Sequence, residues 1–121
     1  MGRAAARGGA GATVDDDAVE AVNEVRLVGR VSGQPDEREL PSGDRVVVFR
    51  LVVARDDGRP DTLDCAVFRG DLRRKARGWV PGDVVAIDGA LRRRFFRAGG
   101  APASRYEVEV AGATRVRRAP G

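Results

Sequence analysis

The most informative pattern in the chain is an alternation of apolar and polar side chains over short segments. It begins at residue 23, where Val25, Leu27, Gly29 and Val31 fall on one side and charged residues dominate the other. Successive side chains of a strand point to opposite faces of a sheet, so this alternation predicts a half-buried strand over residues 23–31. Gly29 within it predicts a bulge or a sharp bend.

The strongest strand pattern covers residues 45–55 and follows a predicted turn at residues 41–44. It is apolar on both faces: the predicted core face carries Val47, Phe49, Leu51 and Val53, and the opposite face carries Val46, Val48 and Val52. A strand of this kind must cover its second face, and a subunit interface is one way to do so.

Three more strands and one helix follow. The strands are predicted over residues 61–69, 84–97 and 105–110, where alternation resumes each time. The helix is predicted over residues 70–78, with Asp71 as its N-cap, Leu72 and Ala76 on one face and Gly78 at its end. Trp79 is predicted to pack beneath this helix.

These elements define one domain with two flanking segments. Residues 1–22, rich in Ala and Gly and carrying the acidic run at residues 15–17, are predicted to be a disordered arm. Residues 23–113 form the domain, and residues 114–121 a short basic tail. An all-β domain of five strands, with one helix between the third and fourth, has the element order of the OB-fold, a Greek-key barrel that binds oligonucleotides.

Charge is distributed unevenly along the chain, whose net charge is +4. Residues 1–68 carry nine arginines against thirteen acidic residues, whereas residues 69–121 carry thirteen basic against five acidic residues. Lys75 is the only lysine, so almost every cation is a guanidinium, which can both pair with phosphate and stack on a base. The basic second half predicts a polyanionic partner.

Composition also argues against several classes of function. The chain has no histidine and a single cysteine, Cys65, so we expect no zinc site, no internal disulfide and no cysteine–histidine nucleophile. It has no phosphate-binding Gly-Lys-Ser/Thr loop and no apolar run long enough to span a membrane. No apolar region follows Arg3 and Arg7, so we expect no secretory signal. We therefore expect a cytoplasmic protein without catalysis, metal, cofactor or small-molecule substrate.

Five segments, taken in order, resemble the bacterial single-stranded DNA-binding protein family. They are residues 23–31, residues 41–43 with the Val-Phe-Arg-Leu strand that follows, and residues 64–69, 82–92 and 106–110. The resemblance covers roughly residues 23–118. It implies an OB-fold that binds single-stranded DNA in replication, recombination or repair, associated with the nucleoid, and assembly as a homo-oligomer, either a tetramer or a dimer.

A binding face can be predicted on the fourth strand. With Leu91 pointing inward, period two puts Arg92, Arg94 and Phe96 together on the opposite face, and Phe68 at the end of the third strand is expected near the same surface. Arginines would contact phosphates and aromatic rings would stack on bases. By resemblance, Phe68 and Phe96 stand where the family carries base-stacking aromatics. The full predicted set is Phe68, Phe96, Arg92, Arg94, Arg69, Arg50, Arg55 and Arg97.

Two differences from the family leave other functions open. The family carries further aromatic residues near the end of the second strand and before the third, where this chain has Arg55-Asp56-Asp57 and Asp61-Thr62-Leu63. Its long acidic C-terminal tail has no counterpart here, as in a shortened paralogue. An RNA-binding OB domain and a protein-interaction OB domain that has lost strong DNA binding are therefore the alternatives.

Overall fold

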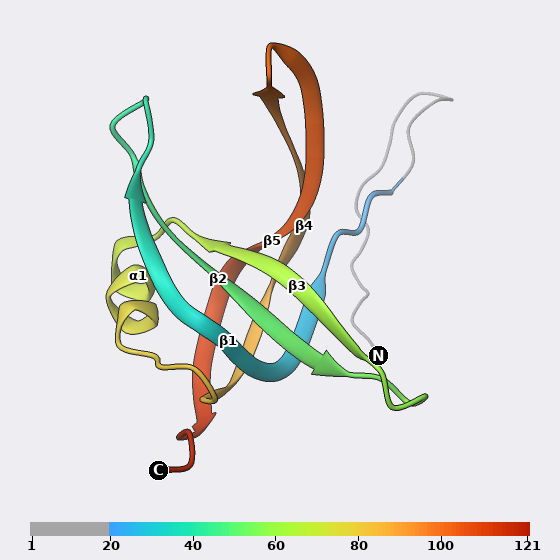
Figure 1. The fold of residues 1–121 in the computed structure, drawn as a ribbon, viewed down its shortest axis with the longest axis vertical. Helices are drawn as coiled ribbons and strands as arrows, with labels where there is room; N and C mark the ends of the chain where they lie inside the picture. The colour runs from blue at the N-terminus through green and yellow to red at the C-terminus, as the bar shows by residue number, and fades with distance from the viewer. Residues whose placement is uncertain (1–19) are drawn as a thin grey trace.

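The structure is a computed structural model that describes residues 20–121. Its elements run in the order β1 (Val25–Glu39), β2 (Arg45–Ala54), β3 (Pro60–Val67), α1 (Gly70–Arg77), β4 (Val84–Ala98) and β5 (Ala101–Arg117), as Figure 1 shows. The helix stands between the third and fourth strands, as predicted. Residues 1–19 of the predicted disordered arm lie outside the described residues.

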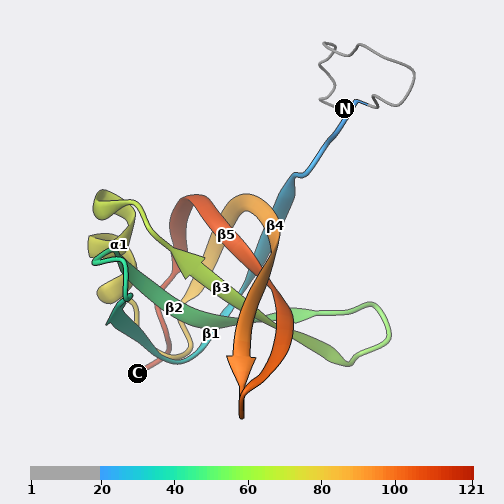
Figure 2. The ribbon, with the colours of Figure 1, turned by 90° about the horizontal axis from the view of Figure 1, so that it is seen from above.

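The strands close into a barrel in the order β1-β2-β3-β5-β4. All neighbouring strands are antiparallel except β3 and β5, which pair in parallel through Cys65 and Val108. Figure 2 shows α1 at one side of this barrel and the turn between β2 and β3 projecting at the other. The five-stranded OB barrel with one helix expected from the sequence is confirmed.

The first strand differs from its prediction in two ways. It continues to Glu39, well past residue 31, because its second half pairs with β2 while its first half pairs with β4. The register shift lies between Ser32 and Asp36, where Gly33 has a positive φ of 80°, and not at Gly29. A Cβ atom on Gly29 would lie 2.5 Å from the carbonyl oxygen of Val52, so this glycine allows β1 and β2 to approach closely.

The core lies inside the barrel and under α1. Val47, Phe49 and Leu51 are buried as predicted, and Trp79 packs edge-on against Phe49 with ring centroids 5.3 Å apart. Leu72 and Ala76 are the buried residues of α1, so the helix covers one end of the barrel.

The structure differs from two further predictions, one about the N-cap of α1 and one about the second face of β2. The N-cap of α1 is Arg69, and Asp71 lies in the first turn, where it accepts hydrogen bonds from the Arg69 guanidinium. On the second face of β2, Val46 is buried and Val48 half-buried within the single chain. This face therefore gives little support for a subunit interface, and the predicted oligomer stays a prediction.

The strands β4 and β5 extend beyond the barrel as a long hairpin (Figure 1). Gly99 and Gly100 connect them with φ angles of 59° and 84°, and two successive positive φ values are what a two-residue type I′ turn requires. Leu91 lies on the same side of β4 as the buried residues Val85 and Ile87, as predicted, but it is 46% exposed because the pairing of β4 with β1 has already ended at Gly89. The prediction that Leu91 points into the core is therefore wrong.

The C-terminal boundary of the domain also moves. β5 continues through Arg117 and pairs with the start of β4, so residues 114–117, predicted as part of a tail, belong to the barrel. Beyond the strand, the backbone N–H of Ala119 donates to the buried carboxylate of Asp83 at 2.7 Å, and the backbone N–H of Val80 donates to the same carboxylate.

Candidate nucleic-acid interface

One face of the β4–β5 hairpin, which we term the Arg94 face, carries Arg92, Arg94 and Phe96 from β4 and Arg105, Glu107 and Glu109 from β5. The register between the strands confirms the prediction that the three β4 residues share a face. Three arginines and two glutamates leave this face with one excess positive charge. It brings two of the predicted arginines, Arg92 and Arg94, together with the exposed ring of Phe96.

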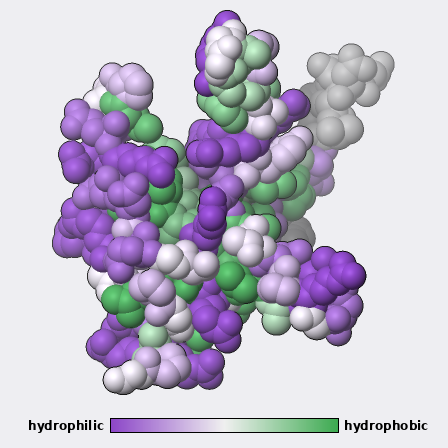
Figure 3. All heavy atoms as spheres, viewed as in Figure 1, coloured by the Kyte–Doolittle hydropathy of each residue, from purple (hydrophilic) through white to green (hydrophobic). Residues whose placement is uncertain are grey.

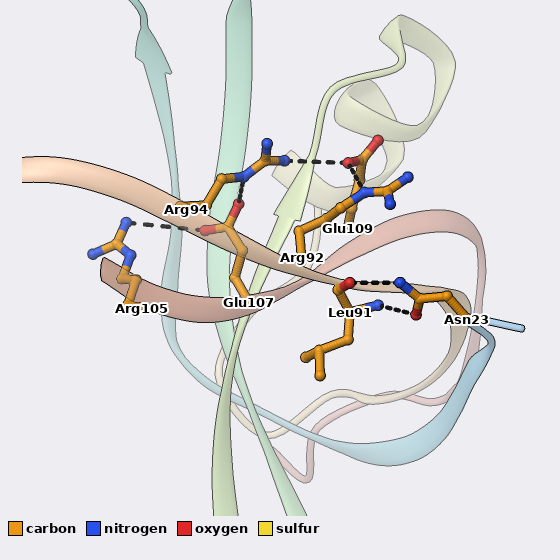
Figure 4. A network of polar contacts seen from close by, with 7 residues as sticks. All are labelled: Asn23, Leu91, Arg92, Arg94, Arg105, Glu107 and Glu109. Atoms are coloured by element: carbon orange, nitrogen blue, oxygen red, sulfur yellow. Dashed lines mark hydrogen bonds and ion pairs between the residues drawn. The ribbon is translucent and has the colours of Figure 1, made fainter. Parts of the chain in front are cut away.

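The arginines of the Arg94 face are paired with its glutamates (Figure 4). The Arg94 guanidinium donates to Glu107 at 2.7 Å and to Glu109 at 3.2 Å, and Arg92 donates to Glu109 at 3.1 Å. Arg105 lies 4.0 Å from Glu107. A phosphate group arriving at these arginines must therefore share them with carboxylates that are already in place.

Glu107 is the most buried member of this network, with 6% of its surface exposed. Its hydrogen bond raises the pKa of Arg94 above the ordinary value, so Arg94 remains a cation throughout the physiological pH range. The alternation of Arg105, Glu107 and Glu109 was visible in the sequence, but nothing in the sequence indicated which arginines of β4 they would meet.

The two predicted aromatic residues lie against arginines of this face. Phe68 directly follows β3 and is half-buried, with the guanidinium carbon of Arg94 5.2 Å from its ring centroid. Phe96 is 43% exposed, and the guanidinium carbon of Arg105 lies 5.7 Å from its ring centroid. These distances fall within the range of cation–π attraction. Phe68 therefore lies next to the Arg94 face, as expected, and its role in binding stays a prediction.

A cavity of about 320 Å³ adjoins the Arg94 face and continues over the outer surface of the barrel. Figure 3 shows the surface hollowed between the β1–β2 end and the β4–β5 end of the molecule. The charged residues that line the cavity are Asp36, Arg38, Arg50, Asp64, Arg105 and Glu107. Of these only Arg50 belongs to the predicted set, and it pairs with Asp64 across β2 and β3 at 3.3 Å. Arg38 was missed because residues 32–40 carried no recognisable strand pattern.

Three predicted arginines belong neither to the Arg94 face nor to the lining of the cavity. Arg69 pairs with Asp71 at 2.8 Å and donates to the Ala111 carbonyl, at the start of α1. Arg55 pairs with Asp57 at 2.7 Å within the β2–β3 turn. Arg97 lies on the opposite face of the hairpin and donates to the Gly100 carbonyl at 2.6 Å.

The structure of residues 20–121 also bears on metal binding, on the reactivity of Cys65 and on membrane-spanning helices. Within residues 20–121 no group of three or more histidine, cysteine, aspartate or glutamate residues is positioned to hold a metal ion. Burial raises the pKa of the Cys65 thiol to about 12, so it stays protonated and is a poor nucleophile. No helix in this part of the chain is long and apolar enough to cross a membrane.

Comparison with known proteins gives a consistent picture. The model of the single-strand binding protein family matches residues 22–116. Single-stranded DNA-binding protein 1 of Staphylococcus aureus (strain COL) is 33% identical over 62% of this chain and 48% of its own length. The single-stranded DNA-binding protein of Oceanobacillus iheyensis is 31% identical over 62% of this chain and 50% of its own length. The chain spans about half the length of the curated relatives it matches.

Solved structures with the same fold include two that align over most of the chain. The Plasmodium falciparum SSB complex with single-stranded DNA has a TM-score of 0.63 at 24% identity and covers 75% of this chain and 88% of its own. The mitochondrial single-stranded DNA-binding protein Rim1 of Saccharomyces cerevisiae has a TM-score of 0.67 at 13% identity and covers 82% and 99%. At these identities the likeness concerns the fold.

Proposed function

The chain belongs to the single-strand binding protein family, and on that premise we propose that it binds single-stranded DNA without catalysis and largely without regard to sequence. The observation that carries this proposal is the contact of Phe68, which directly follows β3, with Arg94 of β4, beside the exposed ring of Phe96. Stacking platforms beside cations are what a single strand requires, because every base has a flat face and every nucleotide a phosphate. The relatives' names support single-stranded DNA as the ligand, and the family resemblance implies a role in replication, recombination or repair.

The geometry supports binding that is sensitive to salt. Stacking of a base on an aromatic ring contributes roughly 1–3 kcal/mol. The phosphate contacts add less than three arginines would suggest, since Glu107 and Glu109 already neutralise part of their charge. Release of counterions from the neutralised phosphates makes the remaining affinity fall as salt rises.

A protein-interaction role without strong DNA binding is the second candidate, and one observation favours it. Arg50, Arg92 and Arg94, all in the predicted site, each form an ion pair with a carboxylate of the same chain. Arginines that already form ion pairs with carboxylates gain less free energy from binding a phosphate. The two candidates differ in whether an oligonucleotide binds at low salt.

We also propose that the chain assembles as a homo-oligomer, a dimer or a tetramer. The side chain of Val28 on β1 is exposed in the single chain although it stands in the middle of a barrel strand, which supports a contact there. Light scattering should give a mass of at least two chains. A monomer mass at micromolar concentration would contradict this part of the proposal.

Fluorescence anisotropy with labelled oligo-dT tests the DNA-binding proposal directly. Wild type should bind oligo-dT far better than duplex DNA, with affinity that falls steeply between two salt concentrations. The double substitution Phe68→Ala/Phe96→Ala should weaken binding by about tenfold or more, because two stacking platforms are lost. Arg59→Ala, in the β2–β3 turn, is the matched control and should bind like wild type.

Each possible failure has a distinct meaning. If wild type does not bind oligo-dT at low salt, the proposed function is wrong. If the double variant binds as tightly as wild type, DNA binds elsewhere on the protein. Tighter binding of oligo-U than of oligo-dT would identify RNA as the preferred ligand.

A further inference from the structure

The opposite side of the hairpin, which we term the Arg93 face, carries the two most exposed aromatic rings among residues 20–121. It carries Leu91, Arg93, Phe95 and Arg97 from β4, with Tyr106 from β5. Phe95 is 74% exposed and Tyr106 is 60% exposed. The faces are separate because side chains alternate along each strand, so no residue of the Arg93 face belongs to the Arg94 face. Figure 4 shows Leu91 pointing away from Arg92 and Glu109.

Arg93 is held in place by aromatic rings rather than by acids. Its guanidinium carbon lies 4.9 Å from the ring centroid of Phe95 and 5.9 Å from that of Tyr106, and its Nε donates to the hydroxyl of Ser104 at 3.2 Å. Among residues 20–121 no carboxylate forms an ion pair with Arg93. A guanidinium oriented in this way keeps its full charge available to an external anion.

The two faces of the hairpin differ in net charge, and this difference indicates the kind of ligand that would bind the Arg93 face. The Arg94 face has three arginines and two glutamates, whereas β4 and β5 contribute two arginines and no acidic residue to the Arg93 face. Excess positive charge is therefore one on the first face and two on the second. A partner that complements the Arg93 face must combine flat apolar groups with closely spaced negative charges, and single-stranded DNA does so.

We propose that the Arg93 face is a second contact surface for single-stranded DNA, on which Phe95 and Tyr106 stack against bases while Arg93 and Arg97 contact phosphates. The proposal rests on the proposed function and extends it to the other side of the hairpin. A strand long enough to pass around the edge or tip of the hairpin contacts both faces, whereas a shorter strand occupies one face at a time.

The single tryptophan of the chain makes a fluorescence test feasible. Trp79 is buried in the core, so DNA at the hairpin does not reach its indole. Phe95→Trp adds an exposed indole to the Arg93 face, and Phe96→Trp adds one to the Arg94 face as the matched positive control. Both variants are titrated with long oligo-dT, and binding of wild type is followed in parallel by anisotropy. Saturable quenching of both added indoles, over the same DNA range as the anisotropy change, is the expected result.

Other outcomes overturn the proposal, and they separate it from the proposed function. Quenching in the Phe96→Trp variant alone means that DNA binds only the Arg94 face, and the proposed function stands. Absence of quenching in both variants, with no anisotropy change for wild type, contradicts both the proposed function and the proposed second contact surface. A concentration-dependent shift of the Phe95→Trp emission without DNA means that a second copy of the chain covers this face.

A charge variant gives an independent readout. Arg93→Ala should weaken binding to long oligo-dT and make the dependence of log K on log salt shallower by roughly 0.7, the value for one phosphate contact on a single strand. Arg59→Ala, which removes a charge in the β2–β3 turn, should leave the slope unchanged. An unchanged slope in Arg93→Ala would overturn the assignment of Arg93 to a phosphate.

Discussion

Glu107→Gln should tighten binding of single-stranded DNA. The amide has the shape of the carboxylate and its oxygen can still accept the hydrogen bond that Arg94 donates at 2.7 Å. The negative charge that also attracts Arg105 at 4.0 Å is lost. The excess positive charge of the Arg94 face then rises from one to two, while the orientation of Arg94 is retained.

The size of the effect follows from the repulsion that the carboxylate exerts on bound phosphate. A phosphate seated on Arg94 would lie about 5–6 Å from the Glu107 carboxylate, where two like charges repel by about 0.7 kcal/mol in water and about 3 kcal/mol at an effective dielectric constant of 20. The phosphate remains hydrated, so a value near 1 kcal/mol applies, or about fivefold in affinity. The salt slope should steepen by roughly 0.7 because one more cation is available.

The assay is anisotropy of labelled oligo-dT at three salt concentrations, with Glu37→Gln as the matched control. Glu37 accepts hydrogen bonds from Arg77 at 2.9 Å and Arg45 at 3.3 Å, which lower its pKa to about 2, so it is charged at neutral pH. It belongs to neither the cavity nor the Arg94 face. Both variants change the net charge by the same unit, so only Glu107→Gln should tighten binding.

Two results would refute this reasoning. Weaker binding by Glu107→Gln with a shallower salt slope would mean that the carboxylate chiefly positions Arg94. Equal tightening in both variants would mean that DNA responds to the total charge of the chain. Thermal unfolding of each variant separates these outcomes from a loss of folded protein.

The remaining predictions concern the barrel. Asp83→Asn should destabilise the protein by about 2–3 kcal/mol at pH 7, as expected when a buried charged acceptor of two hydrogen bonds is lost, and urea unfolding measures this. Hydrogen bonds from the backbone N–H groups of Val80 and Ala119 hold the pKa of Asp83 below its ordinary value of 3.8. The contribution of Asp83 to stability is therefore complete above pH 3.8 and disappears as the pH falls through the lower folded-state pKa. A difference in the free energy of unfolding between wild type and variant that did not narrow in acid would contradict this assignment. Because its pKa is about 12, the Cys65 thiol should react with a disulfide reagent at pH 8 only in urea, and rapid reaction of the native protein would show that the core opens readily.

Much of the barrel could be predicted because its strands are buried on one side. Val47, Phe49 and Leu51 are apolar since they point into the core, and period two follows from that burial. The second half of β1 could not be predicted, because Asp36, Glu37 and their neighbours are held by backbone pairing with β2 and carry no apolar alternation. For Leu91 the prediction failed in the opposite way. The alternation of apolar residues continues along β4 past the part of the strand that pairs with β1, so an exposed residue was predicted to point inward.

The candidate site was predictable only within single strands. Period two is enough to group Arg92, Arg94 and Phe96, and the same rule assigns Arg97 to the side of Arg93, so its inclusion with the first group was avoidable. The pairing with Glu107 and Glu109 depends on the register between β4 and β5, which a turn of two glycines sets. The cavity is lined by residues of four strands, β1, β2, β3 and β5, which come together only when the barrel closes.

The alternation of side chains along the hairpin also limits how its length can change. One residue inserted between Leu91 and Phe95 would transfer every later side chain of β4 to the other side, so that Phe95 and Phe96 would exchange surroundings. Two residues inserted in each strand would lengthen the hairpin and leave both faces intact. Length variation in this hairpin is therefore tolerated only in even steps, whereas insertions in the turn between β2 and β3 meet no such restriction.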